Sequence, residues 1–194
     1  MARKINSKFQ RTVPYTIVGA GKTERFYFSH LRDIYNLKVF IKSRFFGNEN
    51  FPTLEKRIDS ILKDEGKVIA VFDIDVSSCD PNVMEQYRSF AKKYAGNKNV
   101  ILCPSLPSIE YWFLLHYLQT TRHYPSSKSA MDALKSYIPD FDKKEAFLQN
   151  SKWVEEMCAD HKLASAYTRS KTETEFIQSH TDLWKAIDAM DIPV

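Results

Sequence analysis

The run KVIAVFDI, residues 67–74, constrains the fold of this chain more than any other part of the sequence. A near-continuous apolar run of this length is typical of a strand that is buried on both faces, as in a parallel sheet. Shorter runs of strand character lie at 13–18, 37–43 and 100–103, and amphipathic helical patterns lie between them at 23–35, 53–63 and 81–94. Strands that alternate with helices predict parallel pairing through crossover helices, and therefore an α/β sheet.

The pattern changes after Cys103. Residues 107–118 form a largely apolar segment with a proline at its start, which predicts a helix. Further helices are expected at 128–137, 143–149, 152–164 and 173–189. We therefore expect a basic N-terminal arm (1–12), an α/β core (13–120) and a helical C-terminal extension packed on that core (121–194).

Composition narrows the class of protein. The net charge of +4 is too small for a chain that coats nucleic acid along its whole surface. The three cysteines are far apart and form no CxxC pair, which argues against a disulfide framework or a thiolate zinc site. No apolar run approaches the roughly 18–20 residues of a membrane span, and no signal peptide is recognisable. We expect a cytoplasmic protein that does not associate with a membrane.

Two basic segments are candidates for contact with nucleic acid. The first eleven residues contain Arg3 and Lys4 and no acid, so they fit either an arm that touches phosphates or a solvated terminus. The run YTRSKTE, residues 167–173, places Arg169 and Lys171 in an expected loop before the last helix, with the same two interpretations.

The motif GAGKT, residues 19–23, is similar to a nucleotide-binding P-loop but is too short to be one. A P-loop has a glycine five positions before its second glycine, and that position is Thr16 here, inside the first strand. The glycines instead suit a tight turn from the strand into a helix that begins near Thr23 and carries Glu24.

The motif VFDID places Asp73 and Asp75 at the end of the buried strand. Like-charged carboxylates in such a place require a cation or a proton between them, unless they only cap the following loop. Oxygen ligands alone favour a hard ion such as Mg²⁺ or Mn²⁺. The carboxyl edge of a parallel sheet is also where α/β proteins place their sites.

Glu110 lies in the first turn of the apolar helix after the fourth strand. By itself it fits a favourable interaction with the helix dipole. Glu24, Asp73 and Asp75 are expected at the same edge of the sheet, however, and such acidic clusters persist mainly as metal sites.

The segments AGKTE (20–24), DID (73–75) and PSIE (107–110) together resemble the RloB-like branch of the Toprim superfamily, which is related to OLD-type nucleases. The resemblance extends from Val13 to about Tyr167. It implies a Toprim-like sheet flanked by helices and a metal-dependent endonuclease that cleaves tRNA or DNA with one or two Mg²⁺ or Mn²⁺ ions. It also implies a toxic effector of anti-phage defence that acts beside an ABC-type ATPase.

The resemblance also assigns roles to residues. It implies metal ligands at Glu24, Asp73, Asp75 and Glu110. In the nuclease hypothesis that follows, Lys22, Arg169 or Lys171 neutralises the phosphate charge. The family has a glutamate immediately before Gly21, where this chain has Ala20. Because that glutamate is a metal ligand or general acid/base, we expect this form to be inactive. Natural loss and an engineered substitution both explain Ala20, and the retention of the other acids favours the second.

Two other functions remain open. A catalytically dead subunit that only docks on the ATPase has the same sequence features. A HAD-like phosphatase would use Asp73 as nucleophile and Asp75 as acid/base, but that family carries its motif on the first strand, whereas two strands precede it here. The oligomeric state is also open, and a homodimer is among the possibilities.

Overall fold

The computed structural model describes residues 13–19, 21–47, 50–74, 81–120, 122–172 and 179–194. The candidate residues Arg3, Lys4, Ala20 and Asp75 lie outside these ranges. The described residues form one five-stranded sheet and nine helices.

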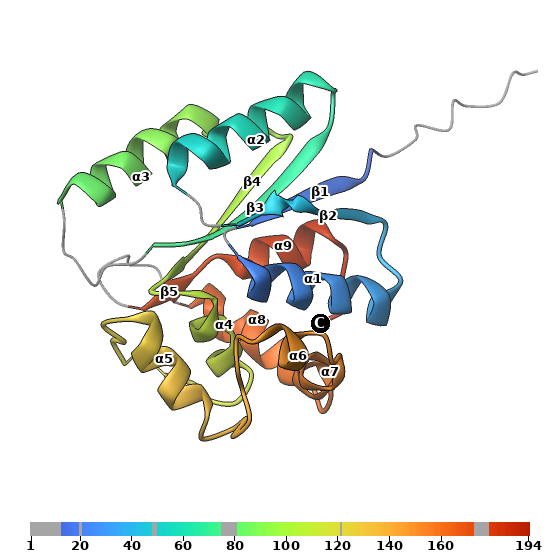
Figure 1. Ribbon diagram of the computed structural model, residues 1–194, viewed down its shortest axis with the longest axis vertical. Helices are drawn as coiled ribbons and strands as arrows, with labels where there is room; N and C mark the ends of the chain where they lie inside the picture. Colours follow the sequence, from blue (N-terminus) through green and yellow to red (C-terminus); the bar gives the residue numbers. More distant parts are fainter. Residues whose placement is uncertain (1–12, 20, 48–49, 75–80, 121, 173–178) are drawn as a thin grey trace, which may run out of the picture.

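The sheet has the strand order β2-β1-β3-β4-β5 and is mostly parallel (Figure 1). The strands are β1 (Tyr15–Gly19), β2 (Val39–Phe46), β3 (Lys67–Asp73), β4 (Val100–Leu106) and β5 (His180–Thr181). The first four pair in parallel, and the two-residue β5 runs antiparallel to the end of β4. The predicted parallel α/β sheet is therefore confirmed, with an antiparallel edge strand that the sequence did not indicate.

Three helices connect the parallel strands, namely α1 (Lys22–Tyr35), α2 (Phe51–Lys63) and α3 (Pro81–Tyr94). Helix α4 (Ile109–Leu115) follows β4. The remaining helices are α5 (Ser127–Leu134), α6 (Glu145–Leu148), α7 (Lys152–Cys158), α8 (Lys162–Lys171) and α9 (Leu183–Ala189).

Strand β3 lies in the middle of the sheet, and its side chains divide between two hydrophobic cores. Val68, Ala70 and Phe72 face the core beneath α2 and α3, whereas Ile69 and Val71 face the core that contains α1, α4 and α9. Alternate side chains of a strand point to opposite faces, so a strand buried on both faces must be apolar throughout. This explains the run that the sequence shows at 67–74.

The two faces of the sheet are covered by different helices. Helices α2 and α3 cover one face, and α1 and α9 lie on the other with the remaining C-terminal helices beyond them (Figure 1). Within this larger core, Trp112 Nε1 of α4 donates a 2.7 Å hydrogen bond to the Tyr27 hydroxyl of α1. The same core contains Ile17 near the start of the chain and Ile192 near its end.

The C-terminal half differs from the prediction in three places. The helix expected at 152–164 is divided into α7 and α8, because Asp160 and His161 adopt positive φ angles of 51° and 58° and turn the chain. Arg169 and Lys171 lie in the last turn of α8 instead of a loop. The helix expected at 173–189 begins only at Leu183 in the described residues and follows β5.

No helix in the described ranges combines the length and apolar character that crossing a membrane requires.

Candidate functional site

The candidate site lies at the carboxyl ends of β1 and β3, which are neighbours in the sheet. The chain leaves β1 toward α1 on one face and leaves β3 toward α3 on the other face. A place where consecutive connections diverge to opposite faces of a sheet is called a switch point. Open α/β sheets bind their ligands in the crevice that forms there.

Glu24 enters this place from the first turn of α1 and is only 3% exposed. Its carboxylate lies close to the turn that precedes the helix, because a Cβ atom added at Gly21 would come within 3.0 Å of Glu24 Oε2. Glycine at position 21 therefore leaves room for the buried carboxylate. Only two positions of the sequence separate the end of β1 at Gly19 from the start of α1 at Lys22, too few for a loop that encloses a triphosphate.

Asp73 is the last residue of β3 and is linked to the start of α4. Its Oδ1 accepts a 2.9 Å hydrogen bond from the backbone N–H of Ile109. The first N–H groups of a helix have no partner within that helix, so this carboxylate caps α4 in addition to facing the crevice. The sequence instead suggests a cap on the loop after β3, and that loop lies outside the described residues.

Glu110 comes from the same end of α4 and is completely buried. Its Oε2 accepts a 2.6 Å hydrogen bond from Ser108 Oγ. Its Oε1 has no hydrogen-bond partner among the described residues, although Lys143 Nζ lies 2.8 Å away and forms an ion pair with it. The Lys143 ammonium therefore compensates the charge of the buried Glu110 carboxylate.

Lys143 is the residue of this site that sequence reasoning missed. It lies between α5 and α6 in a polar segment, and its side chain is 44% exposed. The neighbouring Phe141 is buried in the larger core and fixes this segment near α4. Nothing in the periodicity of the surrounding residues signals this role, because the contact is wholly tertiary.

Burial and neighbouring acidic charges raise the pKa values of Glu24 and Asp73. Burial, followed by the charge of Glu110, raises the pKa of Glu24 to about 7, and Lys143 partly offsets the effect. Burial and the charges of Glu24 and Glu110 raise the pKa of Asp73 well above its usual value, although Asp73 is partly exposed and water relieves part of this effect. Glu24, Asp73 and Glu110 therefore form one electrostatic unit.

The other candidate residues that the structure describes have protein partners elsewhere. Lys22 pairs with Glu145 of α6 at 3.4 Å. Arg169 Nη1 donates a 2.7 Å hydrogen bond to the carbonyl of Leu115, the last residue of α4. Lys171 Nζ lies 4.7 Å from the centre of the Trp184 ring. These contacts give the three residues structural roles, and their contact with phosphates stays a prediction.

The donor chemistry of the cluster suits a hard cation, but the cluster is incomplete as a metal site. All its donors are carboxylate oxygens, which Mg²⁺ and Mn²⁺ prefer. Within the described ranges, no group of three or more His, Cys, Asp or Glu side chains is arranged to hold a metal ion. The two further positions that the sequence analysis assigns to the site, 20 and 75, lie outside those ranges.

The fold and the cluster define a class, namely an α/β protein with buried acids at the switch point of a mostly parallel sheet. Comparison with family models is more specific. The model described as "RloB-like protein" matches residues 15–190, and the chain belongs to this family. No curated protein and no solved structure gives a significant match.

Proposed function

We propose that this chain is a Toprim-type, metal-dependent nuclease in which Ala20 has removed a catalytic carboxylate. One observation carries the proposal. Glu24, Asp73 and Glu110 converge at the switch point, and Lys143 is the cation that offsets their charges. Burying three acids beside one lysine costs free energy. Proteins keep such a cluster mainly where a ligand supplies further positive charge.

In this proposal Asp73, Glu24 and Glu110, together with Asp75, would hold the hard cation. A bound Mg²⁺ or Mn²⁺ would stabilise the negative charge that develops on the oxygens of a phosphodiester during its cleavage. Ser108 keeps the Glu110 carboxylate in one orientation through its 2.6 Å hydrogen bond. Without a metal ion, burial raises the pKa of Glu24 to about 7, and a bound cation would favour its charged form.

The wider context of the proposal rests on the resemblance to Toprim and OLD-type proteins. It comprises a tRNA or DNA substrate, an ABC-type ATPase partner, a cytoplasmic location and a role as a toxic effector of anti-phage defence. Family membership, matched over residues 15–190, supports this context.

Restoring glutamate at position 20 tests the proposal. The Ala20→Glu protein is incubated with Mg²⁺ or Mn²⁺ and with DNA or total tRNA, alone and with its ATPase partner. We expect metal-dependent cleavage that EDTA abolishes. Ala20→Gln has almost the same shape without the charge and is expected to stay inactive, since loss of one general acid/base costs about 10²–10⁴ in rate.

A second candidate is the docking subunit without catalysis, and Ala20 is the observation that favours it. The same experiment separates the two. If the glutamate variant binds metal, binds the ATPase and cleaves neither substrate, the nuclease is rejected and the docking subunit replaces it.

A further inference from the structure

Strand β2 forms one edge of the sheet, next to β1 (Figure 1). The sequence around it, residues 34–48, contains Lys38, Lys42 and Arg44 and no acidic residue. All three cationic side chains are exposed. Neither lysine forms an ion pair with an acid among the described residues. This edge of the sheet therefore presents positive charge to the solvent.

Strand β2 departs from regular pairing where two of these cations lie. It pairs with β1 in register as far as Ile41, and the next pair joins Phe46 to Gly19. Between these pairs β1 contributes only position 18, whereas β2 contributes residues 42–45. The first three residues of this bulge are all exposed. Bulges are frequent beside active sites, where they redirect side chains, and this one exposes both of its cations.

The end of the bulge lies beside the acidic cluster. A Cβ atom added at Gly19 would lie 2.7 Å from Cε1 of Phe46 and 3.4 Å from the Cβ atom of Glu24. The ring of Phe46 and the acid Glu24 therefore flank the same glycine. The chain from Lys42 to Phe46 spans at most about 14 Å, because each residue adds at most about 3.6 Å. The exposed cations thus lie within a few nucleotide lengths of the cluster.

Phe40 adds an exposed aromatic ring to this surface. Its exposed fraction is 50%, and Lys42 Nζ lies 5.6 Å from the centre of its ring. An exposed apolar side chain by itself needs no explanation. A ring beside cations, however, matches both parts of a nucleotide, because bases stack on aromatic rings and phosphates are attracted to cations.

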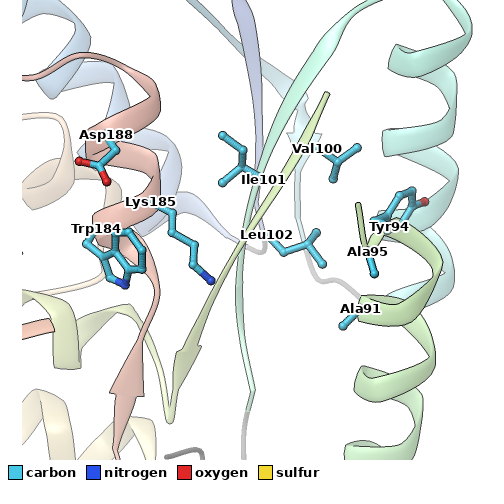
Figure 2. Close-up of a pocket in the computed structure, with 9 residues that line it drawn as sticks. All are labelled: Ala91, Tyr94, Ala95, Val100, Ile101, Leu102, Trp184, Lys185 and Asp188. Carbon is cyan, nitrogen blue, oxygen red and sulfur yellow. The ribbon is translucent and has the colours of Figure 1, made fainter. Parts of the chain in front are cut away.

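The surface near the opposite edge of the sheet is less suited to a polyanion. There β4, α3 and α9 surround an apolar groove of about 490 Å³ (Figure 2). Figure 2 shows Lys185 extending from α9 toward β4, and its Nζ lies 2.8 Å from Asp182 Oδ2. Asp188 also lines the groove and would repel phosphates. The lysine of the groove is thus paired within the chain, whereas the lysines of the β2 edge face the solvent.

We propose that the exposed surface of β2 binds single-stranded nucleic acid, with phosphates on Lys42 and Arg44 and a base stacked on Phe40. The inference rests on the proposed function for one point, namely that the bound strand continues past Phe46 toward the acidic cluster. Cations that neutralise phosphates release counterions, so binding is strongest at low salt. A duplex fits this surface less well, because its bases are already stacked on one another and do not reach Phe40.

Fluorescence anisotropy of labelled oligonucleotides with the purified full chain tests the proposal. The oligonucleotides are a single-stranded RNA, a single-stranded DNA of the same sequence and the corresponding DNA duplex. EDTA is present, so that binding is measured without metal-dependent cleavage. Circular dichroism verifies that each variant is folded.

The first variant combines Lys42→Gln with Arg44→Gln. Its matched control combines Lys92→Gln with Lys98→Gln, which removes the same charge from exposed positions in the last turn of α3 and in the turn that follows. Because Arg44 also interacts with another residue of its own chain, Lys42→Gln alone provides a variant that leaves that interaction in place. Phe40→Leu keeps an apolar side chain and removes the aromatic ring.

We expect both single strands to bind more tightly than the duplex, and the tighter of the two identifies the preferred sugar. The double β2 variant is expected to bind at least about tenfold more weakly at about 50 mM salt, and to reduce the slope of log affinity against log salt by about 1.4. Lys42→Gln alone should reduce the slope by about 0.7. Phe40→Leu is expected to weaken binding about fivefold or more at an unchanged slope. The matched control is expected to keep the affinity and the slope of the unmodified chain.

Failure of both single strands to bind overturns the proposal. An equal loss of affinity in the double β2 variant and its matched control also overturns it, since the net charge of the chain would then explain the binding. Tighter binding of the duplex, or an unchanged affinity in Phe40→Leu, rules out a single strand stacked on Phe40.

The nuclease is judged separately, because it depends on cleavage by the Ala20→Glu variant and not on this binding. If Ala20→Glu cleaves nucleic acid and the double β2 variant in that background cleaves equally well, the β2 surface is rejected and the nuclease stands.

Discussion

Lys143 Nζ lies 2.8 Å from Glu110 Oε1, and this contact joins an exposed segment after α5 to the buried first turn of α4. The lysine thereby brings positive charge to a place where Glu24 and Asp73 also converge. The ion pair is asymmetric, because Glu110 is fully buried and Lys143 is 44% exposed. The carboxylate therefore depends on the lysine more than the lysine depends on the carboxylate.

Replacing Lys143 with methionine is expected to destabilise the protein. The substitution leaves the charge of Glu110 without its partner, and we expect a loss of about 1–3 kcal/mol in the free energy of unfolding at pH 8. The exposure of Lys143 keeps this value below that of a fully buried pair. Urea denaturation measures it. Lys144→Met is the matched control, because Lys144 pairs only with the surface residue Asp142 among the described contacts; equal losses in the two variants contradict the role of Lys143.

In metal-free buffer the contribution of Glu24 to stability is expected to fall as the pH rises from about 4.5 to about 7. The contribution of His116, whose pKa burial lowers to about 4, changes in the opposite direction up to pH 6.5. Burial raises the pKa of Glu24 from 4.5 to about 7 in the folded state. Between these two values the folded chain holds a proton that the unfolded chain releases, so the stabilisation is complete below pH 4.5 and disappears as the pH passes 7. Thermal unfolding at several pH values tests this, and Glu24→Gln should flatten the curve. An unchanged slope in that variant would assign the effect to another group.

After EDTA has been used to remove bound metal from the Ala20→Glu variant, added Mg²⁺ or Mn²⁺ is expected to raise its melting temperature. At about ten times the dissociation constant, binding to the folded state alone gives roughly 3–6 °C for a chain of this size. Asp73→Ala in the same background should remove the shift, whereas Asp33→Ala, on the exposed side of α1, should leave it unchanged. A melting temperature that changes with neither Mg²⁺ nor Mn²⁺ contradicts the metal site.

Arg169→Gln is expected to lower stability by about 1–3 kcal/mol, because the guanidinium bonds to a carbonyl at the end of α4. A residue that served only to bind nucleic acid would show no such loss. The chemical denaturation midpoint distinguishes the two roles, and Lys171→Gln provides a comparison from the same turn of α8, where the side chain is more exposed.

Much of the sheet and of the acidic cluster follows from the sequence. The apolar run 67–74 predicted β3 because a strand buried on both faces has few alternatives. Parallel strands bring their carboxyl ends to one edge, and chain order alone therefore predicts that Glu24, Asp73 and Glu110 lie together. These inferences depend on local pattern and on chain order alone.

The features that were not predicted depend on tertiary contacts. Lys143 reaches the cluster because Phe141 is buried against the core, and no local pattern encodes that contact. Strand β5 has only two residues, too few for an alternating pattern. The break between α7 and α8 rests on the positive φ of His161, which is unusual for a residue with a Cβ atom.

The residues of the two hydrophobic cores are completed at different stages of translation. The core beneath α2 and α3 uses residues between Val18 and Leu106, so it is complete when the first part of the chain has emerged. The core around α1 also needs Trp153, Leu183 and Ile187. The apolar side of α1 must therefore wait through the synthesis of most later helices before it is covered. During that interval the apolar side of α1 is exposed on the nascent chain. A chaperone that binds apolar segments would therefore act on α1.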